Sequence, residues 1–280
     1  VKFSCTKLSQ NNADLVIRCF PNIVELLIKK FIGTIPGLLE VFTNLCKLCL
    51  KGSDNVVKDE DLAALQCCPK MKYFEFNPKY ETTLITDTGL KSIAKSFPNL
   101  LSFCLDGAIR VTDDAIVDIA KCCTHLTKIS LRNCPNASII VLSRCISLVD
   151  CAFEKCEQIT DISLAQLATS HPNLKYLRIS GCPLVTDRTF NKLSESCIHM
   201  RCFTVGPAVG VTDTGLCAVL RGCRQLRHCH ITDCYQLTDK SLLALCEGSR
   251  APLVLVVYKT KMTGPVATTV GIAFPHIQVH

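Results

Sequence analysis

The chain has 280 residues, of which 48% are hydrophobic and 20% are charged, and it carries a formal net charge of +7. These values are typical of globular proteins and exclude an intrinsically disordered chain. They also exclude a membrane-spanning protein, since no stretch approaches the roughly 20 uncharged apolar residues that a spanning helix needs, and residues 1–12 lack the layout of a signal peptide.

The cysteine content indicates a reducing compartment. There are 21 cysteines, which is below the roughly 8–10% of residues that marks a small disulfide scaffold, and an odd number leaves at least one unpaired. A chain of this size does not need disulfide staples. We therefore expect free, mostly buried thiols and a cytoplasmic location, a nuclear location or both.

Copies of the pattern L-x-x-L-x-L recur along the chain, and the first residue of each copy is here called its anchor. Neighbouring anchors are 22 to 29 residues apart. A period of this length is typical of stacked repeats, and the alternating apolar residues predict a short strand in every copy. Residues 1–3 look like the end of a further strand, and residues 274–277 echo residues 97–100, which predicts another strand there. The anchors are Ile23, Leu45, Met71, Leu100, Leu126, Leu148, Leu174, Met200, Leu226 and Leu253.

Thr-Asp pairs predict where the helices begin. Both residue types favour helix N-caps, because their side-chain oxygens accept hydrogen bonds from the first free amides. Apolar residues at the spacing of one buried helical face follow, as in Leu216, Val219 and Leu220, and again in Leu242, Leu245 and Cys246. The short copy that starts at Leu126 lacks the pair. The threonines are Thr86, Thr112, Thr160, Thr186, Thr212 and Thr238.

A strand and a helix of this size cannot cover their own apolar faces, so neighbouring copies must stack. The sequence therefore predicts an α/β solenoid of about ten repeats, with parallel strands on the concave face and helices on the convex face. We expect a single repeat domain over residues 1–280. Residues 1–19 and 274–280 look like incomplete repeats, which predicts a fragment of a longer protein.

Eleven cysteines occupy three fixed positions of the repeat. Those positions require a small apolar side chain between stacked copies, so packing explains them. The first set lies eight residues after an anchor, the second lies three residues before one, and the third takes the second leucine position. The sets are Cys134, Cys156, Cys182 and Cys234; Cys68, Cys123, Cys145, Cys197 and Cys223; and Cys151 and Cys229.

The order L-x-x-L-x-L-x-x-C-x-x-x-T-D-x-x-L-x-x-L is almost complete in residues 174–193 and 226–245. It resembles the cysteine-containing class of leucine-rich repeat that is typical of F-box proteins with such repeats and of the yeast antagonist of the mitotic exit network. The resemblance covers nearly the whole chain. It implies a leucine-rich repeat horseshoe and a protein-interaction function. We expect no cofactor and no metal.

The resemblance implies a more specific role as the substrate-recognition repeats of an SCF-type ubiquitin ligase. The ligase adaptor would bind only through an F-box, and no F-box is present in these residues. The alternative is a stand-alone scaffold or regulatory protein without ligase association. A more remote alternative is a small-ligand receptor, as in plant hormone-sensing F-box proteins, but its pocket would need a basic floor that the mixed concave face does not clearly supply.

The side chains two, four and six residues after each anchor should form the concave, partner-binding face. This face mixes both charges, which argues against nucleic acid as the partner. Lys128 with Asp150, and Arg132 with Glu154, are expected to pair across neighbouring strands. The predicted partner-binding residues are Lys29, Lys47, Lys51, Tyr73, Lys128, Arg132, Asp150, Glu154, Tyr176, Arg178, Cys202, His228 and His230. In the last copy the same frame selects Leu255, Val257 and Lys259.

Three clusters carry alternative hypotheses. Lys29, Lys47 and Lys51 are the least compensated charges and suit an acidic or phosphorylated segment. Cys46 and Cys49 match the C-x-x-C spacing of redox or zinc half-sites, although no second such pair is present. Finally, Cys202, His228 and His230 lie on one predicted face, where they form either a polar contact surface or a zinc site with an open fourth position.

Catalytic motifs are absent from the sequence. There is no G-x-S-x-G, no phosphate-binding glycine loop and no H-E-x-x-H. The recurrent aspartates follow the helix-capping position and do not form carboxylate pairs. We therefore expect no enzyme activity.

Overall fold

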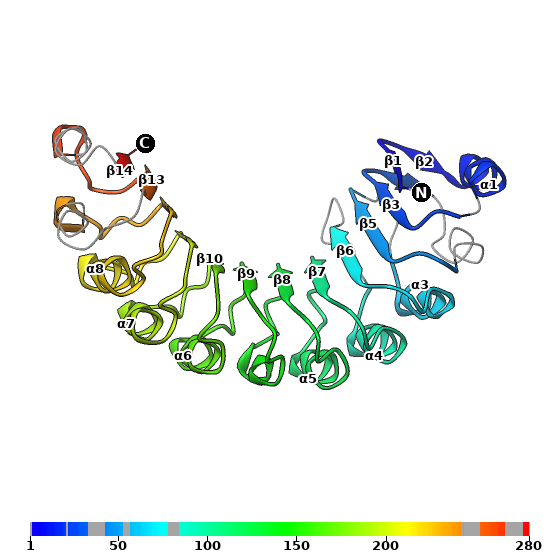
Figure 1. Ribbon diagram of the computed structural model, residues 1–280, viewed down its shortest axis with the longest axis horizontal. Coiled ribbons are helices and arrows are strands. Elements are labelled where there is room, and N and C mark those ends of the chain that lie inside the picture. The colour runs from blue at the N-terminus through cyan, green and yellow to red at the C-terminus, as the bar shows by residue number, and fades with distance from the viewer. Residues whose placement is uncertain are drawn as a thin grey trace. The chain divides into compact units, whose positions relative to one another are not determined.

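The computed structural model describes residues 2–20, 22–32, 43–52, 57–77, 84–241, 243, 253–266 and 277–279. It divides into two units, which are considered one at a time. The N-terminal unit consists of Val1–Ala137 and Arg144–Ser147, and the C-terminal unit consists of Ser138–Ser143 and Leu148–His280. Figure 1 labels the elements of both units.

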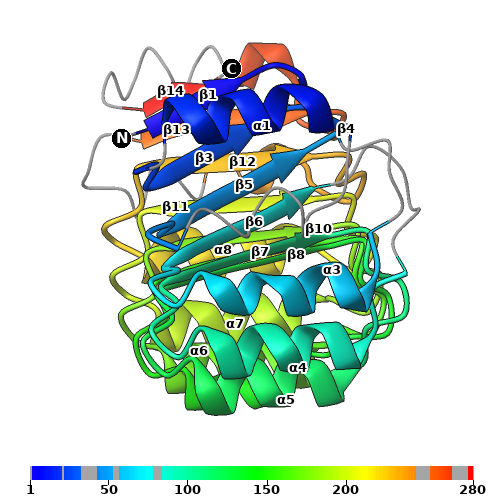
Figure 2. The ribbon, with the colours of Figure 1, turned by 90° about the vertical axis from the view of Figure 1, so that its right-hand side faces the viewer.

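The N-terminal unit is a stack of strand–helix copies in which consecutive strands pair in parallel. Figure 2 shows β3, β5 and β6 side by side, with α3, α4 and α5 in a second layer. A small separate sheet joins β2 to β4. The strands are β1 (Lys2–Cys5), β2 (Leu8–Ser9), β3 (Glu25–Ile28), β4 (Phe31–Ile32), β5 (Lys47–Lys51), β6 (Tyr73–Asn77), β7 (Ser102–Asp106) and β8 (Lys128–Arg132). The helices are α1 (Gln10–Cys19), α3 (Asp59–Ala63) with the 3-10 helix η1 (Ala64–Cys67), α4 (Asp87–Ser96) and α5 (Asp113–Cys122).

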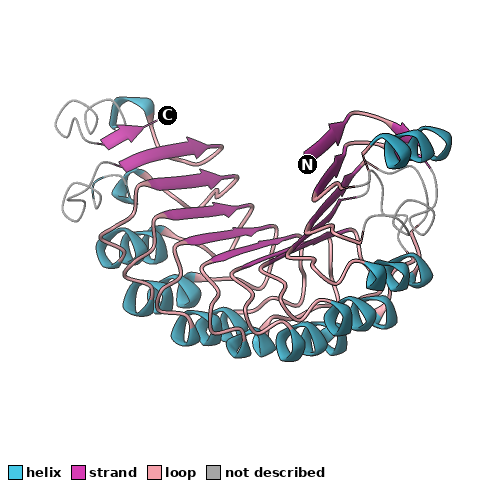
Figure 3. Ribbon diagram, turned by 45° about the vertical axis from the view of Figure 1, so that its right-hand side comes forward, coloured by secondary structure: helices cyan, strands magenta, loops and turns pink. Residues whose placement is uncertain are grey.

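The C-terminal unit repeats this plan, again with parallel pairing between consecutive strands. Figure 3 distinguishes the strands from the helices that follow them. Residues 239–241 and 264–266 are also helical. The copy that starts at Leu126 lacks the Thr-Asp pair and forms only a 3-10 helix, η2 (Ile140–Arg144), whose last residue belongs to the N-terminal unit. The strands are β9 (Asp150–Glu154), β10 (Tyr176–Ser180), β11 (Cys202–Gly206), β12 (His228–Thr232), β13 (Leu253–Tyr258) and β14 (Ile277–Val279), and the helices are α6 (Asp161–Ser170), α7 (Asp187–Ser196) and α8 (Asp213–Gly222).

The core of each unit lies between its strands and helices. The anchors from Ile23 to Leu226 are all buried, as are the apolar strand residues that follow them, such as Leu177 and Ile179. Burying one such side chain contributes roughly 1.5–3 kcal/mol before entropy costs. Each copy therefore depends on its neighbours for stability, and the predicted α/β solenoid of leucine-rich repeats is confirmed.

The strand frame was wrong in one copy, which starts one residue earlier than predicted. His228 lies opposite Val254 and His230 lies opposite Val256, so these two valines take the face that was assigned to Leu255 and Val257. Leu255 is buried. A shift of one residue moves every side chain of a strand to the other face, and the unbroken apolar run of residues 253–257 has no alternation that could have revealed it.

The turn after the strand gives an independent marker of the frame in seven of the copies. In these copies the backbone adopts a positive φ seven residues after the anchor, where glycine is favoured because it has no Cβ. The copy that starts at Met200 is an exception, because Pro207 takes this position. Gly107 and Gly181 take this position, and the corrected last copy places Lys259 there, with φ 52°, outside the strand face to which it was assigned. The described residues with positive φ are Gly52, Gly107, Asn133, Lys155, Gly181, Asp233 and Lys259.

The Thr-Asp pairs have two different roles. Each threonine caps its own helix, as predicted: the Thr160 side chain accepts from the Ser163 amide. The aspartate was expected to cap as well, but its carboxylate instead joins the next copy. Asp161 accepts from the Thr186 amide at 2.9 Å and from the Thr186 hydroxyl at 2.6 Å. The same link joins Asp59 to Thr86, Asp87 to Thr112, Asp187 to Thr212, Asp213 to Thr238 and Asp239 to Thr263.

All eleven repeat-position cysteines are buried, which confirms the packing explanation. Eight of these thiols also donate weak hydrogen bonds to main-chain oxygens, as Cys134 does to the carbonyl of Arg132 at 3.3 Å. Burial raises the pKa of Cys197 to about 12 and that of Cys145 to about 11. These thiols are therefore protonated and unreactive while the fold is intact. Leu242, Leu245 and Cys246 lie outside the described residues.

Candidate functional site

The strand face is defined here as the side chains at positions two, four and six of each copy. In the N-terminal unit, two lysines of this face, Lys51 and Lys47, contact side chains of the same unit. Lys51 Nζ lies 2.9 Å from Glu75 Oε1, and Lys47 Nζ lies 5.8 Å from the centroid of the Tyr73 ring. The prediction of poor compensation was therefore wrong for Lys51. For Lys47 it stays a prediction, because an aromatic ring does not cancel the charge of the ammonium group. Lys29 follows β3 and is exposed.

Glu75 is the centre of this charged group. Burial alone would raise its pKa, but hydrogen bonds from Lys51 and Cys49 outweigh that cost and lower the pKa of Glu75. The Cys49 thiol donates to Glu75 Oε2 at 3.2 Å. Burial, together with the Glu75 carboxylate, raises the pKa of Cys49 to about 12. At neutral pH this is a carboxylate held by a protonated thiol and an ammonium group, which is unsuited to redox chemistry at Cys49.

The last strand of the N-terminal unit, β8, carries Lys128 and Arg132. Arg132 Nη1 lies 3.9 Å from Asp106 Oδ2, and the Asn133 side chain donates to Asp106 Oδ1 at 2.7 Å. Asp150 and Glu154, their expected partners, lie on β9 of the C-terminal unit. Both of those expected pairs stay predictions.

The strand face of the C-terminal unit is ordered in two rows across neighbouring strands. The first row holds Asp150, Tyr176, Cys202, His228 and Val254. The second row holds Ala152, Arg178, Thr204, His230 and Val256.

The electrostatics of these rows favour neutral side chains. Burial lowers the pKa of His230, and the nearby His228 and Arg178 lower it further. Burial raises the pKa of Cys202, which Arg178 only partly opposes. At neutral pH the centre of this face therefore presents a phenol, a thiol, a neutral imidazole and valine methyls beside one guanidinium. Tyr176 is 42% exposed, so its ring is available to a partner.

The zinc hypotheses receive no support from this geometry. Within the part of the chain that the structure describes, no three His, Cys, Asp or Glu side chains are placed to hold a metal ion. This finding covers both Cys46 with Cys49 and the group of Cys202, His228 and His230. Among the same described residues, no helix combines the length and the apolar character that crossing a bilayer requires.

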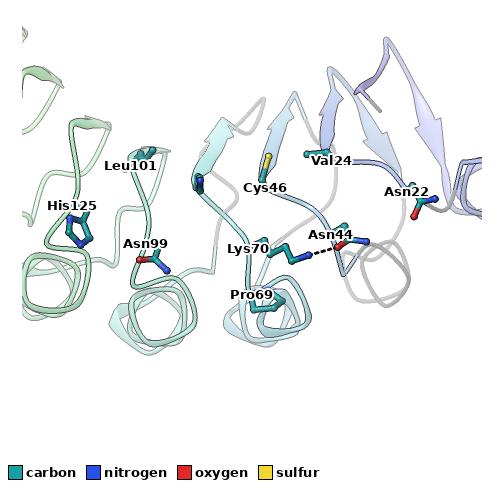
Figure 4. A pocket seen from close by; sticks show the side chains of 10 residues that line it. Asn22, Val24, Asn44, Cys46, Pro69, Lys70, Asn99, Leu101 and His125 are labelled. Atoms are coloured by element: carbon teal, nitrogen blue, oxygen red, sulfur yellow. Dashed lines mark hydrogen bonds between the residues drawn. The ribbon is translucent and has the colours of Figure 1, made fainter.

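A groove of about 770 Å³ in the N-terminal unit was not predicted from the sequence. It runs along the N-terminal ends of the strands, over five successive copies, and its lining residues are drawn in Figure 4. Most of these residues come directly before or directly after an anchor. The signal was present in the sequence, because asparagine, lysine or histidine precedes each of the first five anchors. The lining residues are Asn22, Val24, Asn44, Cys46, Pro69, Lys70, Lys72, Asn99, Leu101 and His125.

No family model matches the chain. Its fold is similar to that of a chain in the crystal structure of the Rad7 and Elc1 complex in yeast, with a TM-score of 0.58 and 13% identity, covering 97% of this chain and 83% of that chain. It is also similar to the internalin InlF of Listeria monocytogenes, with a TM-score of 0.55 and 15% identity, over 94% of this chain and 81% of that one. A third similar structure is the TLR13–ssRNA13 complex, with a TM-score of 0.60 and 14% identity, over 92% of this chain but 35% of that one. At such low identity these similarities show the leucine-rich repeat fold alone.

Proposed function

We propose that the chain is a protein-interaction module that holds a protein partner on its strand faces. The row of Tyr176, Cys202, His228 and Val254 carries the proposal, because it places a half-exposed aromatic ring beside a thiol, an imidazole and a valine side chain on rigid parallel strands, next to Arg178. Tyrosine and arginine are enriched among the residues that contribute most to binding energy at protein interfaces. Strands hold these side chains in place before binding, which lowers the entropy cost of association.

The partner class that we propose is a ubiquitin-ligase substrate, with the chain acting as the recognition repeats of an SCF-type ligase. The support is the resemblance of residues 174–193 and 226–245 to the repeats of F-box proteins, together with the fold shared with a chain of the Rad7 and Elc1 complex. The alternative, a stand-alone scaffold, rests on the same resemblance, since the yeast mitotic-exit antagonist shares this repeat class.

Capture of partners by the full-length product separates these two roles. We expect a tagged full-length protein to retain the ligase adaptor in a pull-down and its reading frame to encode an F-box. If neither the adaptor nor an F-box is found, the stand-alone scaffold replaces the ligase role, while the protein-binding proposal stands.

The strand-face proposal has its own test in a paired substitution. Tyr176→Ala with Arg178→Glu should weaken binding of the captured partner by at least tenfold, because it removes an aromatic contact and reverses the neighbouring charge. The control is Arg188→Glu on α7, an exposed arginine outside the strand face. Isothermal titration measures both affinities. Unchanged affinity in the paired variant, with its melting temperature preserved, would move the interface away from this face.

A further inference from the structure

The groove along the strand N-termini, here called the rim groove, is separate from the strand face. One polar side chain precedes the anchor in each of five successive copies, as the labelled side chains in Figure 4 show, and Lys72 follows its anchor. Apolar side chains alternate with them, among them Val24, Pro69 and Leu101. The rim groove therefore combines a polar row with an apolar strip, which is the usual composition of a pocket that binds a ligand in a defined orientation.

The charged residues among the described lining of the rim groove have one sign. Lys70 and Lys72 are exposed and contribute two ammonium groups, His125 contributes an imidazole, and none of the described lining residues is acidic. On the strand face, by contrast, Lys51 is paired with Glu75. The Lys70 ammonium donates to the Asn44 side chain at 2.7 Å, which holds the lysine in place and leaves its charge uncompensated by a carboxylate.

The backbone in this region is already paired. Cys46 N donates to Val24 O at 2.8 Å, Lys72 N donates to Cys46 O at 2.8 Å, and Leu101 N donates to Lys72 O at 2.8 Å. A ligand therefore cannot extend the sheet by pairing with these amides, and recognition must come from the side chains. Asparagine side chains offer both donors and acceptors, which suits the peptide groups of an extended chain.

The length of the rim groove sets the size of the ligand. Parallel strands lie about 4.8 Å apart, so the four intervals between five strands span about 19 Å. An extended peptide advances about 3.3 Å per residue, and about six residues match this span.

We propose that the rim groove binds an extended, acidic segment of about six residues in a protein partner, with Lys70, Lys72 and His125 meeting its carboxylates. Carboxylates fit better than phosphates, because phosphate is best recognised by arginine forks and the described lining residues include no arginine. Single-stranded nucleic acid fits less well, because its bases need aromatic platforms and, in the part of the lining that the structure describes, His125 is the only ring of this kind. This site goes beyond the proposed strand-face function and does not depend on it.

The test uses the full chain and a fluorescein-labelled decapeptide of alternating glutamate and valine. We expect this peptide to bind in a salt-dependent manner, and the same peptide with glutamine in place of glutamate to bind at least tenfold more weakly. In fluorescence anisotropy, Lys70→Glu with Lys72→Glu should weaken binding of the acidic peptide at least tenfold. Lys72→Glu alone, which leaves the bond between Lys70 and Asn44 in place, should weaken it about threefold.

The matched control is Lys91→Glu with Lys95→Glu, which reverses two exposed lysines on α4 and should leave the affinity within twofold. Equal binding of the acidic and glutamine peptides would overturn the proposal, and so would an unchanged affinity in both rim-groove variants. A phosphoserine decapeptide or a labelled single-stranded RNA that binds more tightly than the acidic peptide would also overturn it. The strand-face variant at Tyr176 and Arg178 lies in the other unit and should bind the acidic peptide normally, so failure of one proposal can be told from failure of the other.

Discussion

The two units share a buried frame but carry different strand faces. In the N-terminal unit, Lys51, Glu75 and Cys49 form one closed group, and Lys47 lies over Tyr73. In the C-terminal unit, the rows around Tyr176 hold neutral thiol, imidazole and valine side chains. Stacking therefore strongly restricts which residue types can occupy the inward positions and hardly restricts the outward positions. The same repeat can for this reason carry two kinds of surface.

The largest change in the free energy of unfolding is expected on replacing buried phenylalanines. These substitutions test whether the buried frame is equivalent in both units. Phe103 stacks on Phe74, with centroids 6.1 Å apart, and Phe203 meets Phe190 edge-on at 5.2 Å. All four rings are fully buried. Phe103→Ala and Phe203→Ala should each lower the free energy of unfolding by about 3–5 kcal/mol, because each leaves a cavity.

Urea denaturation measures these losses. Tyr73→Ala, at an exposed aromatic position, is the control and should cost less than about 1 kcal/mol. A loss near that of the control for either phenylalanine would show that the two frames are not equivalent.

The second effect concerns the aspartate links between copies. Asp161→Ala in the C-terminal unit removes the acceptor for the Thr186 amide, the Thr186 hydroxyl and the Thr189 hydroxyl. Asp87→Ala in the N-terminal unit removes the carboxylate that accepts hydrogen bonds from the amide and the hydroxyl of Thr112. We expect a loss of about 1–3 kcal/mol at Asp161 and a smaller loss at Asp87. Thermal denaturation at pH 7 ranks the two variants, and a larger loss at Asp87 would contradict the expected order.

The Asp161 link also predicts a dependence on pH. Burial disfavours its charge, but the hydrogen bonds from Thr186 and Thr189 outweigh burial and lower the pKa of Asp161. The pKa of Asp213 is lowered in the same way by Ser241 and Thr238. A carboxylate with a lowered folded-state pKa stabilises fully above the usual aspartate value of about 3.9, and this contribution is lost as the pH falls below it. The melting temperature should therefore fall below pH 4, and less steeply in Asp161→Asn.

The smallest effect concerns the charged group of the N-terminal strand face. Lys51 and Glu75 are both more than a third exposed as side chains, so solvent weakens their attraction. Lys51→Ala should therefore change the free energy of unfolding by less than about 1 kcal/mol. Urea denaturation at low and high salt checks this. A loss above about 2 kcal/mol would show that the group is a structural element and not a binding surface.

The repeat frame could be predicted because burial leaves a periodic mark on the sequence. Positions such as Leu174 and Leu177 must be apolar because they are buried between the strands and the helices. Each capping threonine must directly precede the helix that it caps. The frame failed at Leu253, where residues 253–257 are all apolar and the two faces of the strand look alike. There the positive φ of Lys259, a backbone property, shows the true register.

The candidate sites were harder to predict, because they depend on contacts between copies. The sequence places Lys51 and Glu75 in different copies, and only the strand register brings the two charges together. The rim groove was missed for a related reason. The predicted binding positions were the second, fourth and sixth residues after each anchor. Asn44 and Lys70 instead precede their anchors, and they form a surface only when copies stack.

The buried thiols give seven of the ten copies a chemical reporter of their own. A thiol such as Cys197 or Cys229 is shielded from water and holds its proton, so an alkylating reagent reaches it only when that copy opens. Pulsed alkylation read by mass spectrometry would therefore date the opening of each of these seven copies separately. No engineered label is needed, because the same cysteines that fill the gaps between copies record when those gaps widen.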